Sequence, residues 1–87
     1  MKTQKVLITN ETGLHARPAS MFVDEAMKYS CDIFIDNGLQ KVSAKSILNI
    51  LSMAILKGQE ITISTDGEDE EKALQNLVGI IKSNLDE

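Results

Sequence analysis

One short stretch combines the residue types that can receive and pass on an anionic group: Gly13-Leu14-His15-Ala16-Arg17-Pro18-Ala19-Ser20. It contains the single histidine and the single proline of the chain. Because proline lacks a backbone N–H and is tolerated in the first turn of a helix, Pro18 predicts a helix that begins at about Ala16 or Arg17, with His15 at its N-cap. The N–H groups and the positive dipole end of a helix N-terminus favour anions, and Arg17 adds a permanent cation. The pattern therefore predicts a histidine placed to receive an anion.

Phosphoryl transfer is the chemistry that suits this arrangement. A neutral imidazole is a good nucleophile towards phosphorus, and the phosphoramidate that it forms stays reactive enough to be passed on. Transfer needs positioning and charge stabilisation, which the backbone N–H groups near Ala16 and Arg17 and the Arg17 guanidinium can supply. The alternative for a lone histidine is a plain helix cap on a surface turn. For a lone histidine the cap is the ordinary interpretation, and the neighbouring Arg17-Pro18 is the first observation against it.

Length and composition predict one soluble domain. The chain has 87 residues, of which 43% are hydrophobic and 25% charged, and its net charge of -4 argues against non-specific nucleic-acid binding. The single cysteine, Cys31, cannot form an internal disulfide and is interpreted as structural. No signal peptide or membrane-spanning segment is predicted, so we expect a cytoplasmic protein, without cofactor or metal site. The acidic run from 68 to 71 is expected to complement the dipole of a helix start.

Hydrophobic periodicity predicts seven elements in the order βαββαβα. Strands are expected over 5–9, 32–36, 39–43 and 60–64, and helices over about 16–28, from Ser46 as N-cap to Lys57-Gly58, and over about 69–85. Asn37-Gly38 predicts a type I′ hairpin turn. In the second helix, Ile50, Met53 and Ile55 are the expected core residues. The pattern indicates an α+β domain with one antiparallel sheet covered on one face by helices, but leaves the order of the strands open, since a ferredoxin-like arrangement shares βαββαβ.

Two motifs in register resemble the HPr family, the phosphocarriers of the bacterial phosphoenolpyruvate-dependent sugar phosphotransferase system. The stretch Gly13 to Ala19 resembles the histidine motif of that family, and Val42-Ser43-Ala44-Lys45-Ser46-Ile47 resembles the regulatory serine motif found in HPr of low-GC Gram-positive bacteria. The resemblance covers essentially the whole chain, so residues 1–87 are expected to form a single HPr domain. It implies an open-faced sandwich with strand order 1-4-2-3 and three helices on one face.

The resemblance also implies roles and partners. His15 would accept a phosphoryl group on Nδ1 from enzyme I, which draws on phosphoenolpyruvate, and would pass it to the IIA domains of sugar permeases. The protein would thus be a carrier rather than an enzyme. Ser46 alone predicts only an N-cap, but the family adds phosphorylation by HPr kinase/phosphorylase and a corepressor role with the catabolite control protein. A dianion at this helix start is tolerated by the dipole and would act on docking rather than on the fold.

The second helix is nearly all apolar, so part of it is expected to be exposed to partners. The predicted partner surface combines the anion site with a small apolar patch: His15, Arg17, Ser20, Met21, Ile47, Leu48 and Leu51. Such a patch suits brief docking by a monomer to several proteins. Asn49 and Asp24 depart from the family, and an acid at position 24 is expected to weaken association with acidic partners.

Three other functions compete with the carrier. A purely regulatory HPr-like module would act through Ser46 and protein contacts, but relatives of that kind lack the active histidine. A carrier of a paralogous, nitrogen-related branch is the second alternative, against which the intact Lys45-Ser46-Ile47 segment argues. A ferredoxin-like domain that binds small molecules is the third, and the sequence shows no glycine-rich phosphate loop, metal cluster or paired carboxylates for it.

Overall fold

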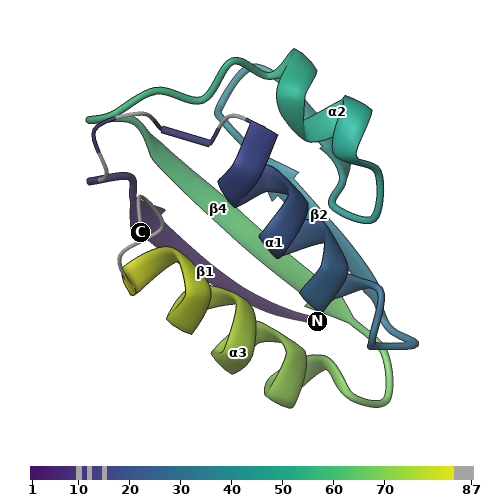
Figure 1. Cartoon of the computed structure of the whole chain (residues 1–87). Coiled ribbons are helices and arrows are strands. Elements are labelled where there is room, and N and C mark those ends of the chain that lie inside the picture. The colour runs from purple at the N-terminus through teal and green to yellow at the C-terminus, as the bar shows by residue number, and fades with distance from the viewer. Residues whose placement is uncertain (10, 12, 15, 84–87) are drawn as a thin grey trace.

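A computed structural model describes residues 1–9, 11, 13–14 and 16–83, and the order of its elements is the predicted βαββαβα (Figure 1). The elements are β1 (Lys2–Leu7), α1 (Ala16–Ala26), β2 (Asp32–Asp36), β3 (Lys41–Ser43), α2 (Ile47–Ser52), β4 (Glu60–Asp66) and α3 (Glu70–Lys82).

The four strands form one antiparallel sheet in the order β1-β4-β2-β3, which confirms the arrangement implied by the family resemblance. β4 lies between β1 and β2, and its residue Ile63 pairs with Gln4 on one side and with Ile35 on the other. All three helices lie on one face of this sheet (Figure 1). The result is the predicted two-layer, open-faced sandwich.

The core lies between the helices and the covered face of the sheet. Successive side chains of a strand point to opposite faces, so the alternating isoleucines of β2 and β4 all point to the helices. Each helix adds its apolar stripe. The side chains at the centre of the core are less than 2% exposed, and the largest include Ile8, Phe22, Ile33, Ile35, Ile61, Ile63 and Leu77. The predicted stripe of α3, from Ala73 to Ile81, is buried as expected.

Strand ends differ most from the predictions at β1. We expected a strand over 5–9, whereas β1 covers Lys2–Leu7. Its first residues are exposed and carry no apolar alternation, so periodicity could not detect them. They join the sheet through the backbone, because Thr3 pairs with Ser64 and Lys2 pairs with Thr65, which lies one residue beyond the predicted end of β4.

The hairpin between β2 and β3 is not the predicted type I′ turn. That turn needs positive φ at both Asn37 and Gly38, and only Gly38 has it, with a φ of 93°. The loop instead spans four residues, because the Asn37 side chain accepts hydrogen bonds from the backbone N–H groups of Leu39 and Gln40, each at 2.9 Å. As a consequence, β3 begins at Lys41 rather than at residue 39.

Helix α2 ends earlier than predicted, at Ser52 rather than near Lys57-Gly58. Ala54 has a φ of 52°, in the left-handed region that ends a helix. The chain then turns so that Ile55 is buried, and the Ile55 carbonyl accepts a hydrogen bond from the Leu14 N–H at 3.0 Å. The three predicted core residues of this segment, Ile50, Met53 and Ile55, are confirmed as buried.

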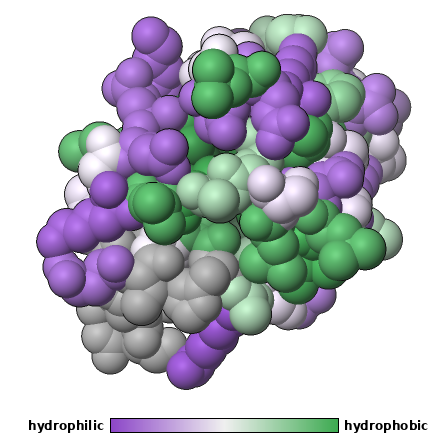
Figure 2. Space-filling view, turned by 90° about the horizontal axis from the view of Figure 1, so that it is seen from above, coloured by the Kyte–Doolittle hydropathy of each residue, from purple (hydrophilic) through white to green (hydrophobic). Residues whose placement is uncertain are grey.

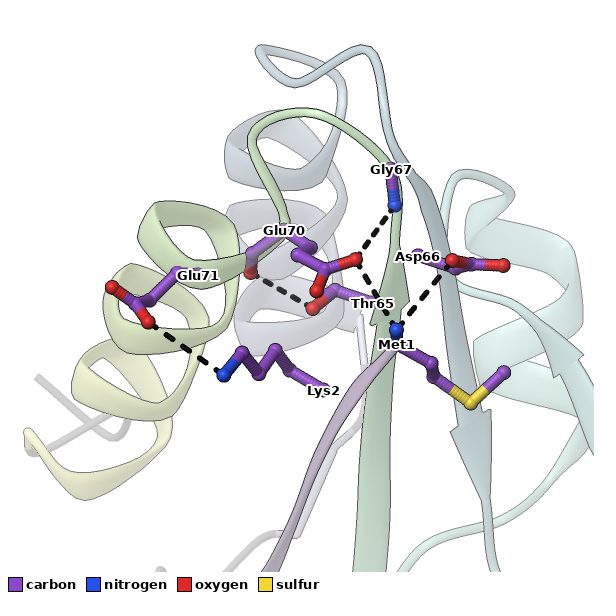
Figure 3. Close-up of polar contacts among 7 residues, drawn as sticks. All are labelled: Met1, Lys2, Thr65, Asp66, Gly67, Glu70 and Glu71. Atoms are coloured by element: carbon purple, nitrogen blue, oxygen red, sulfur yellow. Dashed lines mark hydrogen bonds and ion pairs between the residues drawn. The ribbon is translucent and has the colours of Figure 1, made fainter.

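Carboxylates at the start of α3 bind the ends of neighbouring segments (Figure 3). The Glu70 carboxylate accepts a hydrogen bond from Gly67 N–H at 3.0 Å and pairs with the Met1 amino group at 3.4 Å. Thr65 Oγ1 donates to the Glu70 carbonyl at 2.8 Å. Glu70 and Glu71 are in the first turn, as predicted for acids that complement the helix dipole.

Asp69 lies at the N-cap of α3 but its side chain does not cap that helix. Its carboxylate accepts hydrogen bonds from the backbone N–H groups of Ser30 and Cys31, both at 3.0 Å. These bonds hold the pKa of Asp69 below its usual value. The carboxylate thereby joins the start of α3 to the segment that links α1 to β2.

A tight backbone approach at Gly13 generates the first prediction. Gly13 has a φ of 66°, and a Cβ added there would lie 2.3 Å from the Ile55 carbonyl oxygen. Gly13→Ala is therefore expected to lower the free energy of unfolding by about 2 kcal/mol or more. Gly79→Ala is the control, since a Cβ at this position in α3 meets nothing within 4 Å. It should stabilise the helix by up to about 1 kcal/mol. Urea unfolding measures both, and equal stabilities would contradict the Gly13 contact.

The second prediction concerns the pH dependence of stability. Because folding lowers the pKa of Asp69, its contribution is present above the ordinary carboxyl pKa and is lost as the pH falls through the folded value. Asp69→Asn should therefore be less stable than the parent protein at pH 7, and the difference should shrink towards pH 3. Urea midpoints at several pH values measure this, with Asp24→Asn on the exposed side of α1 as the control. A difference that is constant with pH would show that ionisation of Asp69 contributes nothing.

Candidate functional site

The start of α1 lies where the sequence predicted it. The helix begins at Ala16, and Pro18 is buried in its first turn, where a missing N–H removes no helical hydrogen bond. Ala16 and Arg17, the predicted phosphoryl-binding residues, are both exposed. As the first two residues of a helix, their N–H groups lie before any i−4 acceptor. His15, the predicted phosphoryl acceptor, lies outside the described residues.

The segment before α1 is held by the turn that follows α2. Leu14 N–H donates to the Ile55 carbonyl at 3.0 Å, and Leu14 itself is buried. Further back, Ile8 N–H donates to the Gln59 carbonyl at 2.9 Å, and Gly58 N–H donates to the Ile8 carbonyl at 2.8 Å. The Lys57 ammonium also pairs with Glu11. Residues distant in sequence thus support the chain that leads into the candidate site.

Ser46 is the N-cap of α2. Its φ and ψ of -125° and 118° are extended, and its Oγ accepts a hydrogen bond from Asn49 N–H at 3.4 Å. This confirms the cap that its residue type predicted. The Asn49 side chain makes a second contact by donating to the Ser43 carbonyl at 3.4 Å, which joins α2 to the end of β3. Ser46 itself is half-buried, at the boundary between the surface and the packed base of α2.

Lys45, beside Ser46, is half-buried. Its ammonium donates to the Tyr29 carbonyl just beyond α1 at 2.6 Å, and a cation is favourable near a helix C-terminus. Tyr29 also joins two helices, because its hydroxyl donates to Glu25 at 2.7 Å and accepts from Asn76 of α3. The hydrogen bond from Tyr29, together with that from Lys28, lowers the pKa of Glu25. The serine motif is thus built into the packing of the helices.

An apolar surface covers the end of the molecule where α2 and the start of α1 lie. Leu48 is 75% exposed, Met21 44% and Leu51 36%, while Ser20 and Ile47 are half-buried. Figure 2 looks onto this end and shows hydrophobic side chains gathered across it. Helices α1 and α2 contact one another, so these five members of the predicted partner surface belong to adjoining elements.

Leu56 is an exposed residue in this region that the sequence analysis left out of the partner surface. The pattern assigned it to α2, but α2 ends at Ser52, and Leu56 lies in the following turn with 62% of its surface exposed. An apolar residue just before the helix-ending Lys57-Gly58 was the feature of the sequence that could have indicated its exposure. We therefore add Leu56 to the candidate surface.

Neither the cysteine nor a metal-binding cluster forms a second reactive site in the described part of the chain. Burial, with Asp69 nearby, raises the pKa of the Cys31 thiol to about 11, which keeps it protonated and poorly nucleophilic. Among residues 1–9, 11, 13–14 and 16–83, no group of three or more histidine, cysteine, aspartate or glutamate side chains is placed to hold a metal ion. Nor does any helix in those ranges have the length and hydrophobicity needed to span a membrane.

Comparison with known proteins assigns the fold and motifs to one family. The family model described as the PTS HPr component phosphorylation site matches residues 2–83. The HPr-like protein Crh of Bacillus subtilis is 41% identical over 85 residues, which cover 98% of this chain and all of Crh. Phosphocarrier protein HPr of Haemophilus influenzae is 42% identical over 81 residues, covering 93% of this chain and 95% of that protein.

Solved structures agree with these relatives. HPr-C-His from Thermoanaerobacter tengcongensis is 44% identical and superposes with a TM-score of 0.95, covering 100% of this chain and 98% of that one. Bacillus subtilis Crh, in a crystal structure described as a domain-swapped, intertwined dimer, is 42% identical with a TM-score of 0.77 and 97% coverage of both chains. The family model matches residues 2–83, the strand order is that of the family, and the similar proteins cover nearly the whole chain. The chain therefore belongs to the HPr family of phosphotransferase-system phosphocarriers.

Proposed function

We propose that this protein is a histidine phosphocarrier of the sugar phosphotransferase system. The observation that carries the proposal is the intact histidine motif at the start of α1 in a chain that matches the HPr family over residues 2–83. In this function, His15 Nδ1 attacks the phosphorus held by phospho-enzyme I, a new N–P bond forms, and the bond to enzyme I breaks. A IIA domain of a sugar permease then takes the phosphoryl group by the same displacement.

The surroundings described for α1 support this role. Arg17 is exposed at the first turn, where its guanidinium is available to stabilise an incoming phosphoryl group, and the N–H groups of Ala16 and Arg17 add donors. The protein contributes positioning and charge, and it is consumed and regenerated in each cycle rather than acting as an enzyme. No cofactor is needed, and a single domain over residues 1–87, located in the cytoplasm, suffices.

The apolar surface supports brief docking to several partners. Leu48, Leu51 and Met21 expose enough apolar surface for a small interface beside the phosphoryl site, with Ser20 and Ile47 at its base. The partners proposed are enzyme I, the IIA domains, HPr kinase/phosphorylase and the catabolite control protein. The carrier is proposed to act as a monomer. The intertwined Crh dimer and an HPr dimer from Thermoanaerobacter tengcongensis indicate that a second copy is a competing partner.

A purely regulatory module is the second candidate, because two of the similar proteins are HPr-like proteins called Crh. Such a module would act through phosphorylated Ser46 and not through histidine transfer. The presence of His15 within an otherwise intact motif favours the carrier.

Labelled phosphoenolpyruvate and enzyme I test the carrier directly. The parent protein should take up one acid-labile, base-stable phosphoryl group and pass it to a IIA domain, and His15→Ala should take up none, because it lacks the nucleophile. If His15→Ala takes up as much label as the parent protein, the phosphoryl acceptor is a residue other than His15. A parent protein that takes no label from enzyme I, while a kinase with ATP modifies Ser46, would establish the regulatory module instead.

A charge at Ser46 tests the control of docking. Ser46→Asp should slow phosphoryl transfer from enzyme I by roughly tenfold or more, because an acid beside the half-buried Ile47 and the exposed Leu48 opposes their desolvation against a partner. The fold should remain, since the helix dipole favours an acid at the N-cap of α2. Initial transfer rates and thermal unfolding measure the two effects.

Ser83→Asp, at the end of α3, adds the same charge far along the chain from α2 and serves as the control. Equal rates for Ser46→Asp and Ser83→Asp would show that a charge at position 46 does not affect docking.

A further inference from the structure

The turn over residues 54–59 lies against the segment that leads into α1, although some 45 residues separate the two along the chain (Figure 1). The two segments share backbone hydrogen bonds at both of their ends. Near β1 and β4, Ile8 exchanges bonds with Gly58 and Gln59, and next to α1 the Leu14 N–H donates to the Ile55 carbonyl. The shape of the turn therefore determines where residues 13 and 14 lie.

Gln59 fixes the shape of that turn. Its side-chain oxygen accepts a hydrogen bond from Leu56 N–H at 2.6 Å, while its own backbone N–H donates to the Leu56 carbonyl at 3.2 Å. Its carbonyl also accepts the bond from Ile8 N–H at 2.9 Å. A single residue thus closes the turn upon itself and connects it to Ile8, the residue that follows β1.

The contact between the two segments leaves little room for movement. A Cβ on Gly13 would lie 2.3 Å from the Ile55 oxygen and 2.9 Å from Leu56 Cα, so the backbones are packed against each other. Leu14 is buried and cannot shift without disturbing the core. A change in the turn is therefore transmitted to Gly13 and Leu14, directly before position 15. Small errors in placing a reacting group reduce its rate strongly.

We infer that Gln59 is a positioning residue for phosphoryl transfer by His15, acting through the 54–59 turn and the Leu14–Ile55 hydrogen bond. The inference rests on the proposed carrier function. In this role Gln59 acts through the 54–59 turn, whose shape supports Gly13 and Leu14 in the segment before α1. Since its hydrogen bond to Leu56 is exposed, water replaces the lost acceptor in a variant, so the fold is retained while the turn relaxes.

The test compares three variants with the parent protein. Gln59→Leu removes the acceptor, Gln59→Glu keeps an oxygen at the same place, and Gln75→Leu makes the same change on the exposed side of α3. Enzyme I and phosphoenolpyruvate supply the phosphoryl group, and the rate is measured as a function of carrier concentration. Amide hydrogen exchange of Leu14 is measured on the same proteins, since its bond to Ile55 protects it.

We expect Gln59→Leu to lower the maximal rate of phosphorylation by about tenfold with little change in KM, and to speed exchange at Leu14. Gln59→Glu should restore both, and Gln75→Leu should alter neither. Normal rate and exchange in Gln59→Leu would overturn the inference, as would a failure of Gln59→Glu to rescue.

Failure of the carrier function itself gives a different result. The parent protein would then take no label at all, and exchange at Leu14 alone would decide whether Gln59 positions the loop. Unchanged Leu14 protection in Gln59→Leu would then overturn the positioning role.

Discussion

The pairing of β4 with both β1 and β2 is the constraint on which the rest of the structure depends. Ile61 and Ile63 of β4 are fully buried, and Ile63 is paired with β1 on one side and with β2 on the other. Because their side chains point to one face, the helices must cover that face. The starts of α1 and α2 are then set by the segments that connect the helices to these strands.

The apolar part of the candidate site arises because α2, which follows Ser46, packs only one of its faces on the sheet layer. A six-residue helix cannot bury every apolar side chain that it carries. Ile50 points to the core, whereas Leu48 lies on the outside. The same element therefore stabilises the fold through one face and offers a partner surface through the other. Ser46 lies at the boundary of the two, where a charge can influence docking without entering the core.

The sequence predicted those parts of the fold in which side-chain periodicity determines the backbone. The limits of β2 and the buried stripe of α3 were correct because apolar residues recur at the strand and helix periods. The strand order came from resemblance to a family, since periodicity holds no information on which strands are neighbours.

The missed features depend on contacts between distant residues. The first half of β1 is polar and joins the sheet only through its backbone, and Ala54 ends α2 in a conformation that its residue type does not indicate. For the candidate site, the sequence predicted the cap at Ser46 and the exposure of Leu48, both local properties. It could not reveal that Ile55 and Gln59 support the chain before α1, because that contact exists only once the sheet has formed.

The position of β4 also determines the order of events during synthesis. β1 is synthesised before the other strands and pairs only with β4 in the described sheet. Lys2 therefore cannot pair until Thr65 has been synthesised. Only the β2–β3 hairpin and local helical turns can form earlier. Contacts so distant in sequence slow folding, since a long loop must close before they contribute. A nascent chain of this protein therefore exposes its unpaired first strand until β4 has emerged.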